Sequence, residues 1–103
     1  MPTYHKFKAK PTDVDNIKFA SRKEAKYYME LKLRQRAGEV LFFLRQTPIH
    51  LPGNTKYVCD FQVFLSDGSV QFVDVKGVET EVFKLKKRQV EELYPIEIVI
   101  TWC

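Results

Sequence analysis

The hydrophobic pattern of this chain changes period at Gly38, and that change limits the folds that the chain can adopt. Before Gly38, apolar residues recur at helical spacing between about residues 21 and 36. After it, they come in short runs of strand length, a second helical pattern covers about residues 81–93, and a β-branched run follows at 96–102. The sequence therefore predicts a helix, three strands, a second helix and a fourth strand.

Both predicted helices carry start and stop signals. Ser21 and Glu24 have capping-box spacing, and Gly38 is suited to end the first helix. Thr80 is placed to cap the second helix, which Pro95 closes. The apolar residues at helical spacing are Ala25, Tyr28, Leu31, Met29 and Leu33 in the first helix and Val82, Phe83, Val90 and Leu93 in the second.

The middle of the chain predicts three strands. Val40–Leu44 is the first, and Pro48 and the turn-rich segment 51–54 interrupt it. The runs 57–65 and 70–76 flank a Ser-Asp-Gly-Ser turn and predict an antiparallel hairpin. A sheet with helices packed on it follows.

Composition limits the class of protein. A chain of 103 residues with 45% hydrophobic residues forms one globular domain and is not disordered. We expect a basic N-terminal arm, extended or mobile, over residues 1–20, and a single domain over 21–103. No apolar stretch reaches the length of a membrane span and no secretion signal is visible, so we expect a cytoplasmic protein that does not bind membranes. The two cysteines, Cys59 and Cys103, form neither a disulfide framework nor a zinc signature.

The positive charge is concentrated in the first third of the chain. Residues 1–36 hold ten Lys and Arg against four Asp and Glu, a net charge of +6, although the whole chain has only +4. A second basic cluster, KLKKR, occupies residues 84–88. These clusters indicate a nucleic-acid partner, with a solvated surface helix as the structural alternative.

Three charged residues stand where a strand should be apolar. They are Asp60, Asp74 and Lys76. Side chains two apart in a strand share a face, so Asp74 and Lys76 point the same way, and pairing through the turn places Asp60 opposite Asp74 or its immediate neighbour. The hairpin therefore predicts a site.

Two carboxylates this close repel each other and favour a cation between them. Mg²⁺ and Mn²⁺ prefer oxygen ligands, so Asp60, Asp74 and the backbone carbonyl of Val75 are candidate ligands. The Lys76 ammonium is placed to orient or help deprotonate a water that attacks a phosphodiester, and to offset charge in the transition state. The structural alternatives are two aspartates on a solvated hairpin face and a Lys76 that merely neutralises them.

These residues resemble the PD-(D/E)XK nucleases. Asp60 and the D-X-K triplet Asp74-Val75-Lys76 match the family motif, and Glu24 on the preceding helix matches the helix acid. The resemblance implies a restriction-endonuclease-like αβββαβ core, of α/β (α+β) class, with a mixed four-stranded sheet flanked by two helices. It also implies that Glu24 is a metal ligand, since Ser21 can cap the helix alone, with the capping-box role of Glu24 as the structural alternative. The catalytic set that it implies is Glu24, Asp60, Asp74 and Lys76.

Nearly the whole chain is similar to small phage and prophage recombination endonucleases, a group that includes Holliday-junction resolvase-like proteins. Cys59 stands where the superfamily motif has Pro, and Ala20 stands where related proteins often carry an acid. The matching segments are 19–25, 31–39, 46–51, 57–61 and 73–86. The resemblance implies Mg²⁺, which Mn²⁺ can replace, branched DNA as substrate, a homodimer, and the cytoplasm of a bacterial or phage-infected cell.

The expected DNA contacts lie around this motif. Their residues are Lys23, Lys84, Lys86, Lys87 and Gln46, each with a plain surface role as the alternative. Two other functions stay open: a nickase or replication-repair nuclease acting on flaps or single strands, and a non-catalytic nucleic-acid-binding module.

Overall fold

A computed structural model describes residues 12–102 and confirms the predicted element order. The helices are α1 (Arg22–Arg36) and α2 (Glu81–Leu93). The strands are β1 (Thr12–Val14), β2 (Ile17–Phe19), β3 (Val40–Leu51), β4 (Thr55–Leu65), β5 (Val70–Val75) and β6 (Ile98–Thr101).

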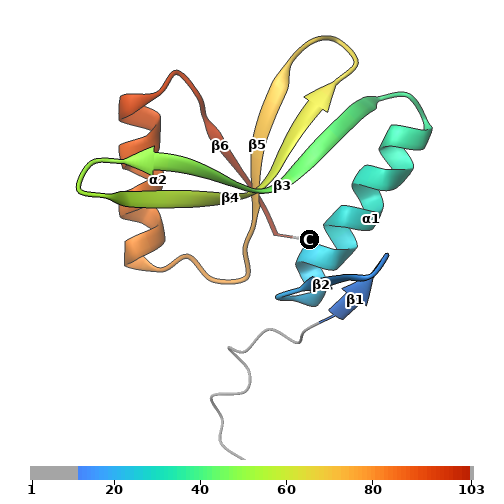
Figure 1. The fold of residues 1–103 in the computed structure, drawn as a ribbon, viewed down its shortest axis with the longest axis horizontal. Helices are drawn as coiled ribbons and strands as arrows, with labels where there is room; N and C mark the ends of the chain where they lie inside the picture. The colour runs from blue at the N-terminus through green and yellow to red at the C-terminus, as the bar shows by residue number, and fades with distance from the viewer. Residues whose placement is uncertain (1–11, 103) are drawn as a thin grey trace, which may run out of the picture.

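The main sheet is mixed and has the strand order β3-β4-β5-β6. Two hairpins join β3, β4 and β5 as antiparallel neighbours, and α2 connects β5 to the parallel strand β6 (Figure 1). Together with α1 this gives the predicted αβββαβ core, with a four-stranded mixed sheet and two helices.

Both predicted N-caps are present in the structure. The Ser21 hydroxyl accepts a hydrogen bond from the N–H of Glu24 at 3.1 Å, and the Thr80 hydroxyl accepts one from the N–H of Phe83 at 3.1 Å. The helix α1 ends at Arg36, and Gly38, which follows the C-cap Ala37, has a φ of +85°, a conformation that glycine adopts without steric cost. The local signals thus place both helices.

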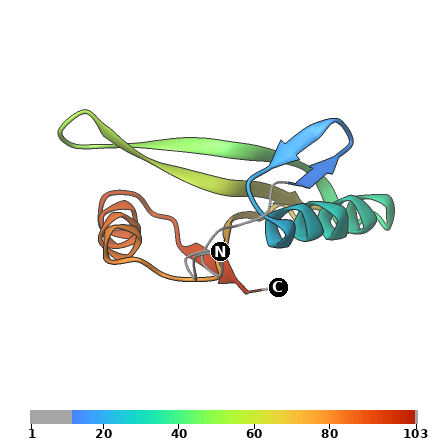
Figure 2. The same cartoon turned by 90° about the horizontal axis from the view of Figure 1, so that it is seen from below.

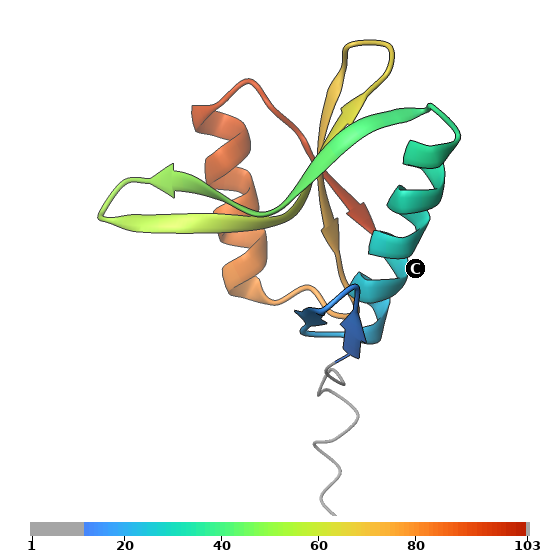
Figure 3. The same ribbon diagram turned by 45° about the vertical axis from the view of Figure 1, so that its right-hand side comes forward.

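Each helix covers its own hydrophobic core beneath the long β3–β4 hairpin, which passes over both helices in Figure 2. Leu31 of α1 lies in the first core and Val90 of α2 in the second. Figure 3 shows β5 and β6 running between the two helices. Four residues at helical spacing are exposed instead of inward, because the sheet covers only one side of each helix: Met29, Leu33, Val82 and Leu93.

The strand β3 is longer than the apolar run 40–44 suggested, and Pro48 does not interrupt it. Pro48 pairs with Val58 of β4, and β3 is the edge strand of the sheet. An edge strand tolerates proline because one side of its backbone has no ladder partner. The predicted break at Pro48 was therefore wrong.

The N-terminal arm expected over 1–20 is also corrected where the structure describes it. Residues 12–19 form the β1–β2 hairpin, whose two central residues Asp15 and Asn16 have φ of 54° and 62°. Phe19 is fully buried in the first core, and the Tyr28 hydroxyl donates to Asp15 at 2.9 Å. These contacts tie the hairpin to α1, while residues 1–11 lie outside the described part of the chain.

Candidate active site

The side chains of Asp60 and Asp74 each accept a hydrogen bond from a backbone N–H of the neighbouring strand, across β4 and β5. The strands pair with Phe64 opposite Val70, as the turn predicts. The Asp60 N–H donates to Oδ1 of Asp74 at 2.8 Å, and the Val75 N–H donates to Oδ2 of Asp60 at 3.0 Å. The predicted meeting of the two aspartates is therefore confirmed.

The second carboxylate oxygen of Asp74 is buried without a hydrogen-bond partner within the described residues. Only 1% of Asp74 is exposed. Burial raises the pKa of Asp74 and that of Asp60, although backbone N–H bonds and the Lys76 charge act in the opposite direction. A buried carboxylate oxygen with no donor lacks the compensation that such a group normally requires.

Glu24 faces these aspartates from the first turn of α1. Its side chain is 6% exposed. Gln46 of β3 donates from Nε2 to Oε2 of Glu24 at 3.0 Å and lies 3.5 Å from Oδ1 of Asp60. Burial and the Asp60 charge raise the pKa of Glu24. Because Ser21 caps the helix through its own hydroxyl, the Glu24 carboxylate is free to serve the site, and Gln46 connects it to Asp60.

Arg45 belongs to this site although its sequence context did not single it out. Its guanidinium lies 3.7 Å from Oε2 of Glu24 and 4.4 Å from the ring centroid of Phe19. Its Nε is buried without a partner in the part of the chain that the structure describes. The available signal was a charge at the end of the apolar run 40–44, the same kind of signal that identified Asp60.

Lys76 lies next to the aspartates but does not pair with them. Its N–H bonds the carbonyl of Thr101 at 2.9 Å, which fixes its backbone against β6. Its Nζ lies 4.1 Å from the ring centroid of Phe83, and no ion pair of the described residues includes Lys76. The Lys76 charge nevertheless lowers the pKa of both aspartates against the effect of burial. Sequence spacing predicted its nearness, and packing decides where its ammonium rests.

The site does not present a preformed cage for a metal. Among the described residues, no three His, Cys, Asp or Glu side chains gather closely enough to hold an ion. Mg²⁺, however, keeps several waters and commonly binds through only one or two carboxylates. The donors fit such an ion, since they are oxygens and Asp74 has one left unpartnered. Val75 lies beside Asp60 through its N–H, and its carbonyl stays a predicted ligand.

The predicted DNA-contacting lysines of α2 are held by the protein itself. Lys84 lies 3.5 Å from Glu81, and Lys87 lies 3.1 Å from Glu91. Lys86 donates to the carbonyl of Lys56 at 3.2 Å. Each of these three side chains thus has a partner on α2 or at the start of β4.

The cations of α1 are less engaged. Lys23 lies 3.5 Å from the carbonyl of Trp102, whereas Arg22 and Lys26 have no ion pair within the described residues. A shallow pocket of about 620 Å³ runs along this part of the helix. Its lining residues are Thr12, Arg22, Lys23, Ala25, Lys26 and Met29. The pocket begins on the same helical turn as Glu24.

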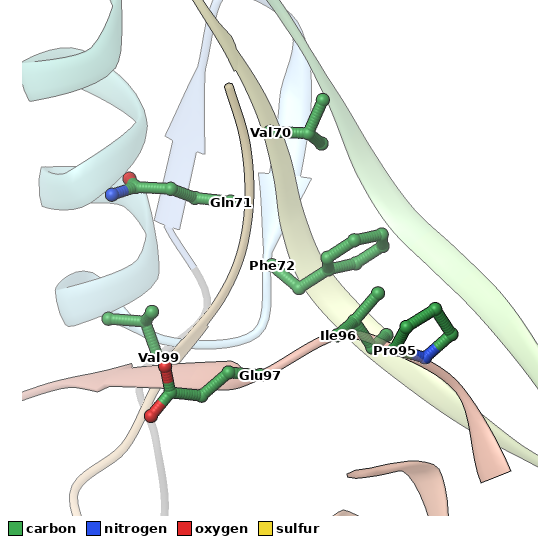
Figure 4. A pocket seen from close by; sticks show the side chains of 7 residues that line it. All are labelled: Val70, Gln71, Phe72, Pro95, Ile96, Glu97 and Val99. Atoms are coloured by element: carbon green, nitrogen blue, oxygen red, sulfur yellow. The ribbon is translucent and has the colours of Figure 1, made fainter.

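A second pocket, of about 280 Å³, lies where β5 meets β6. Figure 4 shows Val70 and Phe72 pointing to one side of β5 and Gln71 to the other. Glu97 is the charged residue in its lining, which otherwise holds little that could do chemistry. This pocket is separate from the carboxylates at the other end of β5.

The Cys59 thiol, one residue before Asp60, is not a nucleophile of this site. It is fully buried and free. Burial raises its pKa to about 11, so the thiol stays protonated at neutral pH.

Neither helix of the described chain has the length and apolar character that crossing a bilayer requires. Comparison with curated proteins and with solved structures gave no significant match. A family model, described as "Protein of unknown function (DUF1064)", matches residues 4–103. That match covers nearly the whole chain, which therefore belongs to the DUF1064 family.

Proposed function

We propose that this protein is a metal-dependent DNA endonuclease that hydrolyses phosphodiester bonds with Mg²⁺, in the manner of PD-(D/E)XK nucleases. The observation that carries the proposal is the buried oxygen of Asp74, which has no donor among residues 12–102, beside a second aspartate fixed on the neighbouring strand. A pair of acids that exists only for stability would have that oxygen satisfied. A divalent cation is the partner that satisfies it and offsets the raised pKa values of the acids.

The proposed roles follow from the contacts. Asp60 and Asp74 would hold the ion, with Glu24 as a further ligand on the α1 side, and the bound ion would lower the pKa of a water and polarise the phosphate. The Gln46 amide contacts both Glu24 and Asp60 and so fixes the position of one carboxylate relative to the other. Lys76 keeps an ammonium beside the aspartates, where it can orient the attacking water and offset negative charge on the phosphate in the transition state.

The substrate class is DNA, and we propose branched DNA cut by a homodimer in the cytoplasm of a bacterial or phage-infected cell. Arg22 and Lys26 of α1 support contact with phosphates close to Glu24, because neither has an ion pair with an acid of the described chain. A single chain holds one set of acids, so two symmetric cuts require two copies.

The test is a cleavage assay on matched four-way junction, flap, single-stranded and linear duplex DNA with Mg²⁺, Mn²⁺ or EDTA. Asp74→Ala and Lys76→Ala should abolish cleavage while the folded variants still bind DNA. Glu91→Gln on α2 is the matched control, since Glu91 lies outside the site.

The outcomes separate the functions. Junction cutting that needs a divalent ion and is lost in Asp74→Ala supports the proposal. A preference for flaps or single strands supports a nickase or repair nuclease. DNA binding without cleavage in any metal would replace the enzyme with a non-catalytic binding module, and retained cleavage in both variants would overturn the assigned residues.

A further inference from the structure

The Lys76 ammonium rests on an aromatic ring instead of on an acid. Its Nζ lies 4.1 Å from the centroid of Phe83, well within the range of a cation–π contact. The Lys76 charge lowers the pKa of both Asp60 and Asp74 against the effect of burial. No ion pair of the described residues joins it to either of them. The ring therefore competes successfully with two nearby carboxylates for a flexible cation.

Phe83 is held rigidly enough to act in this way. Its backbone N–H is bonded by the Thr80 cap, which fixes the first turn of α2. Its side chain is 8% exposed and belongs to the second core, where its ring lies 6.1 Å from that of Tyr57. The backbone of Lys76 is fixed independently by its bond to Thr101. The Phe83 ring and the Lys76 backbone are thus both fixed, and only the Lys76 side chain can move.

The placement has a chemical consequence. If the ammonium formed an ion pair with Asp60 or Asp74, it would occupy the carboxylate oxygens that a metal ion needs. Its own N–H groups would then be donated to the carboxylate. A ring face attracts the charge without accepting a conventional hydrogen bond. Held there, the ammonium keeps its N–H groups available to a water or a phosphate oxygen.

We propose that Phe83 is a positioning residue that holds the Lys76 ammonium beside the two aspartates and apart from them. This role rests on the proposed nuclease function. It gives α2 a part in the chemistry through its first turn, although its lysines are held by the protein.

The experiment compares Phe83→Leu, which keeps an apolar side chain but loses the ring, with Phe83→Tyr, which keeps the ring. In Phe83→Leu we expect kcat on the preferred DNA to fall about 10-fold with KM changed less than about 2-fold, since the expected effect of a cation–π contact is of that order. Phe83→Tyr should restore most of the rate. Circular dichroism and thermal melting check that both variants fold.

A second measurement needs no catalysis. In the metal-free protein, the ring current of Phe83 should shift the NMR signals of the Lys76 side-chain methylene next to the nitrogen upfield of those of other lysines. The Lys76→Arg variant, which lacks these signals, assigns them. Phe83→Leu should remove the shift and Phe83→Tyr should keep it.

The outcomes are distinct. A missing ring-current shift overturns the contact even if the wild type cuts DNA. A shift that is present while Phe83→Leu cuts at the wild-type rate, or while Phe83→Tyr is as slow as Phe83→Leu, overturns the positioning role. If the wild type cuts no DNA in any metal, the nuclease proposal fails and the positioning role falls with it, whatever the NMR signals show.

Discussion

The two helices carry similar numbers of charges but use them differently. On α2, Lys84 pairs with Glu81 and Lys87 with Glu91, and Glu91 also accepts the N–H of Ile98 at 2.8 Å, which joins the helix to β6. On α1, Glu24 is buried beside Asp60, and Arg22 and Lys26 have no acidic partner in the described chain. The bond from Ile98 to Glu91 joins α2 to the sheet, whereas the unpaired cations near Glu24 are the ones that the proposed function would use on phosphates. Under the proposed function, α1 is therefore the helix that we expect to face DNA, whereas α2 supports the sheet.

The largest expected difference is in cleavage. Glu24→Gln should lower the rate about 100-fold or more, because it removes a charge from the acid cluster while keeping the side-chain size. Glu91→Gln should stay within about 2-fold, because Glu91 bonds Ile98 and Lys87 and contacts none of the acids of the site. Single-turnover rates on the preferred DNA measure both. Equal losses in the two variants would contradict the division between the helices.

The affinity for DNA should depend more on the cations of α1 than on those of α2. Arg22→Gln with Lys26→Gln should weaken binding about 10-fold at moderate salt and reduce the slope of log K against log salt by about 2, because each released phosphate contact contributes about 0.9. Lys84→Gln with Lys86→Gln removes the same charge from α2 and should change the slope less. Fluorescence anisotropy in EDTA measures binding without cleavage. A larger slope change for the α2 pair would reverse the assignment.

Neutralising an acid should change the stability of the protein in opposite directions on the two helices. At neutral pH, Glu24→Gln should raise the melting temperature by a few degrees Celsius, the shift that about 1 kcal/mol produces in a domain of this size. The pKa of Glu24 is raised by burial, so wild-type stability falls as the pH rises from the ordinary Glu range through the higher folded value. The advantage of the variant should therefore disappear at a pH below the ordinary Glu pKa.

Glu91→Gln is the reference for that measurement and should lower the melting temperature at neutral pH, since it weakens a charge-assisted bond to Ile98 and an ion pair with Lys87. Metal-free melting curves between acidic and neutral pH test both variants. A Glu24→Gln protein that is less stable than the wild type across this range would show that the contact with Arg45 outweighs burial.

The smallest difference concerns the caps. Ser21→Ala and Thr80→Ala each remove one side-chain bond to a helix N–H, and each should cost about 1 kcal/mol of unfolding free energy. Similar losses in urea titrations would show that the helices are anchored alike and differ only in their chemistry. A much larger loss at one cap would mean that the helices also differ in stability.

The parts of the fold that could be predicted are those with local causes. Caps at Ser21 and Thr80 and a short turn between β4 and β5 set the helix starts and the pairing of Asp60 with Asp74. The β1–β2 hairpin had a local signal too, in the Asp15-Asn16 pair, whose residue types tolerate positive φ.

The rest depends on packing between distant segments. Arg45 reaches Glu24 only because β3 packs against α1, and Lys76 meets Phe83 only because α2 returns beneath the hairpin. Sequence spacing carries no information on either approach. Pro48 was misread because its tolerance depends on β3 being an edge strand, which is a property of the whole sheet.

The backbone at Gln46 carries a consequence for how this sequence can change. Gln46 has a φ of 53° within β3, a left-handed conformation that costs a residue with a side chain roughly 1 kcal/mol. Glycine would relieve that cost, but it has no amide to connect Glu24 with Asp60. Selection for stability alone should therefore favour glycine at this position, and the amide link between Glu24 and Asp60 would be lost. The residue found at this position thus shows whether a sequence was selected for its site or only for its fold.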